Sequence, residues 1–240
     1  MRITGSLCLA LALAACTPPD APPARGDAAD APPSAATSER SRDETTRPVV
    51  VFFGTSLTAG LGLPSEDDTY VAHAAELARA AGVPFTPVNA GVSGETSAAG
   101  LRRIDWVLQN PLDVLVLELG ANDGLRGLPV DELRENLTEI VRRTRQRQPE
   151  AEVVILAMEA PTNLGERYTT EFRQTFRDVA EREGALLAPF LLEGVAGVPE
   201  LNQPDRIHPT IEGHRRMAEN IMPTLTTAIE SAYERMEPSR

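Results

Sequence analysis

The chain has 240 residues, enough for one domain of ordinary size with additional segments, and its formal net charge is −12. This acidic balance excludes a nucleic-acid groove, which would need a stripe of basic side chains. Hydrophobic residues make up 42% of the chain but aromatic residues only 4%, so we expect a mainly aliphatic core. The only cysteines are Cys8 and Cys16, so no disulfide and no cysteine metal site is expected in the remainder of the chain.

Residues 1–15 have the pattern of an export signal. Arg2 supplies a positive start, and the apolar run that follows from Leu7 is too short to span a bilayer as a stable helix. The run ends in Leu-Ala-Ala before Cys16, which resembles the lipobox of bacterial lipoproteins. The resemblance implies that Cys16 is the lipidated first residue of the mature protein. A plain secretory signal, cleaved at a small residue, is the alternative.

Acyl chains on Cys16 would anchor the protein in a membrane, since several chains together insert stably. Thr17 follows the cysteine, and the lack of aspartate there implies sorting to the outer membrane in a cell with two membranes. We therefore expect an exported protein, lipid-anchored in the cell envelope on the periplasmic face of the outer membrane. Residues 16–47 are rich in proline and alanine and have no apolar periodicity, which predicts a disordered tether.

Residues 48–240 predict one α/β domain. Short apolar runs predict strands at Val49–Phe53, Phe85–Asn89, Asp113–Leu119, Val153–Met158 and Leu186–Phe190. Amphipathic stretches predict helices at Thr69–Ala81, Ser97–Gln109, Pro129–Gln148, Tyr168–Glu183 and Ile211–Tyr233. This alternation with short links predicts a single three-layer α/β/α domain, in which helices cover both faces of a five-stranded parallel sheet. The nearly continuous apolar run at 113–119 is typical of a central strand.

The first predicted strand runs into Gly54 and then Ser56, which indicates a tight turn that exposes this serine. The carboxyl ends of strands are where α/β proteins place their chemistry. The residues around this turn do not match the phosphate-binding or nucleophile motifs of other α/β proteins. There is no G-x-G-x-x-G of a dinucleotide-binding domain, no Lys-Ser/Thr of a P-loop, and threonine stands where an α/β-hydrolase elbow needs its second glycine.

A serine nucleophile needs a base and an acid that orients the base. Of the three histidines, His208 is the best candidate because it lies in a loop between two prolines. His73 and His214 fall within predicted helices and are expected to be structural. Asp205 precedes His208 by three residues, a spacing that can place its carboxylate against the imidazole; its alternative role is to cap the closing helix.

Two further residues are candidate donors to an oxyanion. Gly94 follows the second predicted strand, and its backbone N–H can approach a reacting atom closely because glycine has no side chain. Asn122 follows the third strand, and its side-chain amide can donate. The alternative for both is ordinary turn chemistry. Because all of these segments follow parallel strands, they are expected to converge on one edge of the sheet.

Four segments resemble, in chain order, the four blocks of SGNH (GDSL-type) hydrolases. They are GTSL at 54–57, NAGVSGET at 89–96, ELGANDGLRG at 118–127 and DRIHP at 205–209. The third block, together with residues 189–195, is most similar to the arylesterase and thioesterase I (lysophospholipase L1-like) branch. The match covers roughly residues 48–230 and implies the flavodoxin-like SGNH hydrolase fold.

The resemblance implies a role for each residue. Ser56 matches the nucleophile, and its own N–H contributes to the oxyanion hole with the N–H of Gly94 and the side chain of Asn122. His208 matches the general base and Asp205 the acid that orients it. The implied reaction is hydrolysis of a carboxylic ester or thioester through an acyl-enzyme on Ser56, with no metal and no cofactor.

The expected substrates are small esters, thioesters or lysophospholipids, and a monomer is the default. Two alternatives are a glycan acetylesterase and a non-catalytic, surface-tethered binding protein. Apolar residues near strand ends could line an acyl site or simply pack in the core: Leu57, Leu61, Leu63, Met158, Leu164, Phe190 and Leu191.

One position departs from the family pattern, which usually has aspartate just before the nucleophile. This chain has Thr55. Alternation at a strand end points residue 55 away from Ser56, so it is not expected to belong to the triad. We expect Thr55 to replace a residue that fixes the loop by hydrogen bonds.

Overall fold

The structure is a computed structural model, and it describes residues 47–236. The predicted signal peptide at 1–15, the lipidation site Cys16 and all but the last residue of the predicted tether lie outside the described residues.

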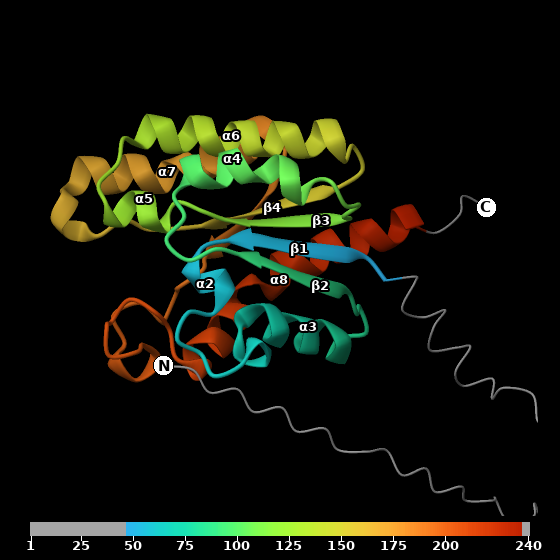
Figure 1. Ribbon diagram of the computed structural model, residues 1–240, viewed down its shortest axis with the longest axis horizontal. Helices are drawn as coiled ribbons and strands as arrows, with labels where there is room; N and C mark the ends of the chain where they lie inside the picture. The colour runs from blue at the N-terminus through green and yellow to red at the C-terminus, as the bar shows by residue number, and fades with distance from the viewer. Residues whose placement is uncertain (1–46, 237–240) are drawn as a thin grey trace, which may run out of the picture.

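The centre of the domain is a five-stranded, all-parallel sheet, as predicted (Figure 1). The strands lie in the order β2-β1-β3-β4-β5, with β3 in the middle. Their bounds are Val49–Gly54 for β1, Thr86–Gly91 for β2, Val114–Glu118 for β3, Glu152–Ala157 for β4 and Leu186–Phe190 for β5. Every residue of β3 is buried, which agrees with its continuous apolar run and its central place.

Helices cover both faces of the sheet, so the three-layer prediction is confirmed. On one face lie α3 (Tyr70–Ala80) and α8 (Ile211–Met236). The other face carries α4 (Ser97–Val107), α6 (Val130–Arg147) and α7 (Glu166–Glu183). The predicted helices differ from these by at most three residues at either end.

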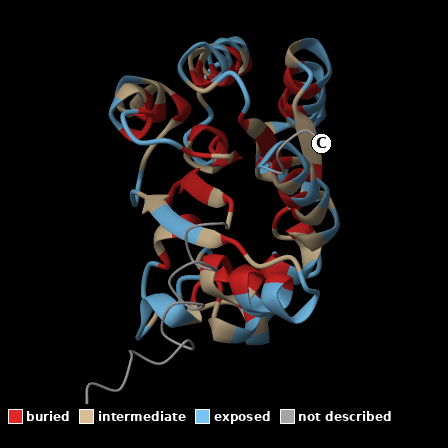
Figure 2. Cartoon of the chain, turned by 90° about the vertical axis from the view of Figure 1, so that its right-hand side faces the viewer, coloured by how far each residue is buried: buried red, intermediate tan, exposed pale blue. Residues whose placement is uncertain are grey.

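The core lies between the sheet and the inner faces of the helices, where buried residues gather (Figure 2). Most of it is valine, leucine, isoleucine and alanine, as the composition predicted. The few aromatic residues are nevertheless concentrated there. Phe52 and Phe53 of β1, Tyr70 of α3, and Phe172 and Phe176 of α7 are all fully buried.

Two short helices at the carboxyl ends of strands were not predicted. They are α2 (Ser56–Ala59), directly after β1, and α5 (Ala121–Leu125), after β3. At four and five residues they are too short to show a helical apolar period in the sequence. Three single-turn 3₁₀ helices were also not predicted, at Glu66–Asp68 (η1), Thr162–Leu164 (η2) and Pro199–Leu201 (η3).

The register of β2, β1 and β3, which are neighbours in the sheet, brings their ends to one level. Gly54 of β1 pairs with Gly91 of β2 on one side and with Glu118 of β3 on the other. The segments that follow these three strands therefore start side by side at the same edge of the sheet.

The described chain begins and ends at the opposite edge. β1 starts there, and the last turns of α8 bond residues at the starts of strands: Ser231 Oγ and Arg235 Nη1 both donate to Glu152 Oε1, and Tyr233 Oη donates to the Pro84 carbonyl.

Gly91→Ala tests how closely β2 approaches α2. A Cβ at position 91 would lie 2.3 Å from the backbone nitrogen of Ala59 and 2.7 Å from the carbonyl carbon of Thr58. Because these are backbone atoms, no rotamer change relieves the clash, and we expect a loss of about 1–3 kcal/mol in the free energy of unfolding. Urea unfolding measures it. Adding Ala59→Gly removes only a side chain and should not restore stability; a Gly91→Ala protein as stable as the wild type would contradict this packing.

Candidate active site

Ser56 is the first residue of α2 and follows the N-cap Thr55. The Thr55 hydroxyl accepts a hydrogen bond from the Leu57 N–H, and the left-handed Gly60 (φ 71°) ends the helix after one turn. As the first helical residue, Ser56 has an N–H for which the helix itself offers no carbonyl partner. The predicted exposed serine thus lies at the carboxyl end of β1, partly accessible, with its N–H available to an incoming group.

The structure brings Ser56, His208 and Asp205 together in a line. His208 Nε2 lies 3.0 Å from Ser56 Oγ, and His208 Nδ1 lies 2.7 Å from Asp205 Oδ2. Because the Asp205 carboxylate can only accept, Nδ1 carries the imidazole proton and Nε2 has its lone pair directed at the serine hydroxyl. This is the arrangement that a nucleophile, a base and an orienting acid require.

Asp205 does not cap α8, which begins six residues later at Ile211. Its Oδ1 instead accepts the backbone N–H groups of Ile207, at 2.9 Å, and His208, at 3.0 Å. Arg206 has φ 60°, the one positive φ of a non-glycine residue within 47–236, and this turn folds the next two N–H groups back onto the carboxylate. Nothing in the residue type of Arg206 predicted that conformation.

Hydrogen bonds also keep Asp205 charged. The His208 ring, followed by the backbone N–H groups of His208 and Ile207, holds the pKa of this carboxyl well below its usual range. Although the side chain is 46% exposed, it therefore remains a carboxylate throughout the neutral pH range.

The two predicted oxyanion donors lie in neighbouring loops that are bonded to each other. Asn122 is the second residue of α5, and its Nδ2 donates to the Glu95 carbonyl at 2.9 Å, which leaves its second amide hydrogen free to donate elsewhere. Gly94 is exposed and has φ 82°, a conformation that favours glycine. Its carbonyl accepts a hydrogen bond from Arg126 Nη2 at 3.0 Å.

Arg103 of α4 holds the Gly94 loop in place. It forms a two-point ion pair with Glu95, at 2.8 and 2.6 Å, and donates to the Ala90 carbonyl at 3.0 Å. Its guanidinium also lies 4.3 Å from the centre of the Phe53 ring. A planar, forked guanidinium can make these contacts at once, so this loop depends on an arginine.

Gln203 was missed by the sequence analysis and connects the loops of Ser56 and His208. Its Nε2 donates to the Leu61 carbonyl at 2.8 Å and to the Pro209 carbonyl at 2.9 Å. No spacing or composition signal marks an amide that bridges two loops 142 residues apart.

Thr55 is fully buried and is bonded to Glu118, as expected for a residue that fixes the loop rather than a member of the triad. Its N–H donates to Glu118 Oε2 at 2.7 Å, and its hydroxyl lies 3.0 and 3.1 Å from the two carboxyl oxygens.

The other two histidines lie outside this line of residues. His214 is fully buried in α8, stacks on Tyr70 and accepts the Tyr70 N–H on Nδ1 at 3.0 Å. Burial, with smaller contributions from His73 and His208, lowers the pKa of His214 to about 4. His214 is therefore a neutral, structural histidine.

The seven residues named as possible acyl-site lining differ in burial. Leu57, Met158 and Leu191 are buried in the core, and three more are partly buried: Leu63, Leu164 and Phe190. Leu61 is 46% exposed, and three further apolar side chains in the same set of loops are exposed to a similar extent: Val92, Leu125 and Ile207. Nothing in the sequence marked these last three residues.

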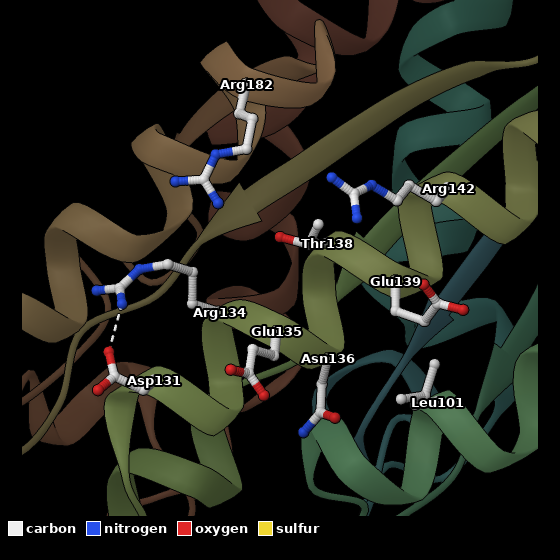
Figure 3. A pocket seen from close by; sticks show the side chains of 9 residues that line it. All are labelled: Leu101, Asp131, Arg134, Glu135, Asn136, Thr138, Glu139, Arg142 and Arg182. Atoms are coloured by element: carbon white, nitrogen blue, oxygen red, sulfur yellow. Dashed lines mark hydrogen bonds and ion pairs between the residues drawn. The ribbon is translucent and has the colours of Figure 1, made fainter.

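A surface cavity of about 690 Å³ lies elsewhere, over α6 (Figure 3). Its lining is mostly charged and comes from α4, α6 and α7: Leu101, Asp131, Arg134, Glu135, Asn136, Thr138, Glu139, Arg142 and Arg182. None of the predicted site residues is among them. Residues 47–236 hold no cluster of three or more histidine, cysteine or acidic side chains suited to a metal ion, and none of their helices is long and apolar enough to cross a membrane.

A comparison of the sequence with models of protein families identifies the family of this chain. Residues 52–216 match the model of the GDSL-like Lipase/Acylhydrolase family. The chain belongs to this family. It is a hydrolase of carboxylic ester bonds, and the non-catalytic alternative is set aside.

Relatives and solved structures agree with this assignment. The chain is 39% identical to Esterase TesA of Pseudomonas aeruginosa over 177 residues, 73% of this chain and 87% of the relative. It is 33% identical to an arylesterase of Vibrio mimicus over 178 residues, 71% of this chain and 84% of the relative. A crystal structure of TesA superposes with a TM-score of 0.71 at 37% identity, covering 75% of this chain and 99% of that one.

His214→Asn tests the neutral histidine through the pH dependence of stability. The unfolded chain takes up a proton on His214 below its ordinary pKa of about 6.5, whereas the folded chain does so only near pH 4. Stability is therefore lost as pH falls from 6.5 to 4, by about 3 kcal/mol for this group. An asparagine oxygen can still accept the Tyr70 N–H and does not titrate. In urea unfolding, the wild type should lose its advantage over the variant as pH falls; parallel curves would contradict the assignment.

Proposed function

We propose that the protein hydrolyses esters by a serine mechanism centred on Ser56. Ser56 Oγ attacks the carbonyl carbon of a carboxylic ester or thioester while His208 Nε2 takes the hydroxyl proton. The imidazolium that forms is oriented and stabilised by Asp205, and it then protonates the leaving alcohol or thiol. Water, activated by the again neutral His208, attacks the acyl-enzyme and releases the acid.

The negative charge on the carbonyl oxygen would be met by three donors from adjacent loops. These are the N–H of Ser56, the N–H of Gly94 and the side-chain amide of Asn122. Such preoriented donors stabilise the charge that develops in the transition state. The Asn122–Glu95 and Arg126–Gly94 hydrogen bonds support this proposal because they fix two of the donors before substrate arrives.

The observation that carries the proposal is the unbroken line Asp205–His208–Ser56, with contacts of 2.7 and 3.0 Å. His208 and Ser56 are 152 positions apart in the sequence, and the fold alone brings them to hydrogen-bond distance.

Apolar acyl esters are the substrate class that we propose. Four exposed apolar side chains lie in the segments that carry the proposed site residues: Leu61, Val92, Leu125 and Ile207. Exposed apolar residues that gather around polar machinery favour a substrate with an apolar part. This favours lipid-like or aryl esters and thioesters over the acetyl groups of glycans.

Replacing the nucleophile tests the mechanism. We expect Ser56→Ala to lower kcat for p-nitrophenyl butyrate by at least about 10³-fold, because the acyl-enzyme cannot form. The same variant should no longer be labelled by an alkyl phosphonate that reacts with activated serines, while folding stays intact. Ser65→Ala, a serine in the loop beyond α2, is the matched control. Residual activity within tenfold of the wild type would contradict the assignment of Ser56.

We also propose lipid anchoring through Cys16, which rests on the lipobox resemblance. Full-length protein produced in a bacterium with two membranes should incorporate labelled palmitate and fractionate with the outer membrane. Cys16→Ser should abolish both the label and the membrane association, while Cys8→Ser changes neither. Equal labelling of the Cys16→Ser protein would contradict the assignment.

A further inference from the structure

A buried carboxyl lies directly beneath the nucleophile turn and takes no part in the proposed reaction. Glu118 ends β3, is fully buried, and is level with Gly54 in the strand register. A Cβ on Gly54 would lie 2.5 Å from Glu118 Oε2, so the absence of a side chain there gives the carboxyl its space. In the sequence it is only a charged residue near the end of a nearly continuous apolar run.

The hydrogen-bond partners of this carboxyl lie within two residues of Ser56, one on each side of it. Glu118 Oε2 lies 2.7 Å from the Thr55 nitrogen, 3.0 Å from the Thr55 hydroxyl and 2.9 Å from the Thr58 hydroxyl. Tyr70 Oη lies 2.9 Å from Thr58 Oγ1. Since a carboxylate only accepts, Thr55 and Thr58 donate to it and Tyr70 donates to Thr58. Every hydroxyl in the cluster then has an acceptor.

We propose that Glu118, as a carboxylate, is a positioning residue for hydrolysis: it holds Thr55 and Thr58 and so fixes Ser56 between them. The proposal rests on the proposed function of Ser56. Thr55 immediately precedes the nucleophile and Thr58 lies two residues beyond it, so both ends of the one-turn helix are tied to one side chain in the central strand. A displacement of about 1 Å in a reacting group is enough to cost roughly 100-fold in rate.

The charge of Glu118 depends on pH in the range where the enzyme would work. Burial raises the pKa of Glu118 to about 7, and the hydrogen bonds from Thr55 and Thr58 oppose that rise. Tyr70 is the titratable group that faces Glu118 within the described residues, and its pKa is raised well above the usual value by burial and by Glu118, so it stays a neutral donor. Below neutral pH the Glu118 carboxyl becomes protonated. The added hydrogen then takes the place of one of the hydrogen bonds that Thr55 and Thr58 donate to it.

Thr55 suits this arrangement. An aspartate at this position would place a second carboxyl against Glu118, and two carboxyls in contact do not both ionise. With threonine, Glu118 is the one carboxyl of the cluster and carries the charge itself.

The first experiment measures kcat and KM of full-length protein on p-nitrophenyl butyrate from pH 5 to 9. Glu118→Gln keeps the shape and removes the charge. We expect kcat to fall roughly 10- to 100-fold with KM within about threefold, because positioning and not binding is lost. Glu118→Gln combined with Thr55→Asp returns one carboxylate to the cluster and should recover most of that loss. Wild-type kcat in Glu118→Gln, or no recovery in a folded double variant, overturns the proposal.

Thr58→Val keeps the test valid if Glu118→Gln does not fold. It removes one donor to the carboxylate, which raises the pKa of Glu118, so the fall of kcat on the acidic side of the pH profile should begin at a higher pH. If Glu118 served stability alone, the pH of this fall would not change, and an unchanged pH overturns the proposal. Ser56→Ala and phosphonate labelling are run alongside. Hydrolysis that persists in Ser56→Ala rejects the serine mechanism itself, whereas loss there with an unaffected Glu118→Gln rejects only the role of Glu118.

Discussion

β1, β2 and β3 end at the same level of the sheet, and the site depends on this alignment. Gly54 is paired with Gly91 on one side and with Glu118 on the other, so three loops leave the sheet from adjacent points. A shift of one residue in either pairing would turn every side chain of a strand to the opposite face. It would also separate the serine from its donors. The register is held by side chains buried on both faces of β1 and β3, which connects core packing directly to the geometry of the site.

The common level of the strand ends does not by itself fix the positions of the loops that follow. Hydrogen bonds between neighbouring segments hold these loops in place. Asn89 Nδ2 donates to the Thr58 carbonyl, Asn122 to the loop of Gly94, and Gln203 to the loop that follows α2. Asn89 lies in β2 itself and bonds the helix that follows β1, whereas the other two bonds join segments that follow different strands. The donors are neutral amides, which hold position without bringing further charge next to His208 and Asp205.

The helices and strands could be predicted from the sequence, because they follow from the pattern of apolar and polar residues. Apolar runs and amphipathic stretches located the five strands and five long helices, and the residue types Ser56, His208 and Asp205 at loop positions suggested their association. Their places after strands made Gly94 and Asn122 candidate donors, and the resemblance to known blocks gave both a role in an oxyanion hole. What escaped prediction depends on three-dimensional contacts: the bridge made by Gln203 and the left-handed turn at Arg206 have no local signature. A fixed hydrogen-bond network also has no period along a chain, so only the finished fold reveals it.

The two ends of the described chain leave the domain on the side away from Ser56. Val49 opens β1 at that edge, and the last turns of α8 are bonded to Pro84, two residues before β2, and to Glu152, the first residue of β4. A reporter domain joined directly to residue 47 or to residue 236 would therefore start on the side away from the serine. Because both of these positions lie at the same edge, residues 47 and 236 could also be joined by a linker and the chain reopened elsewhere.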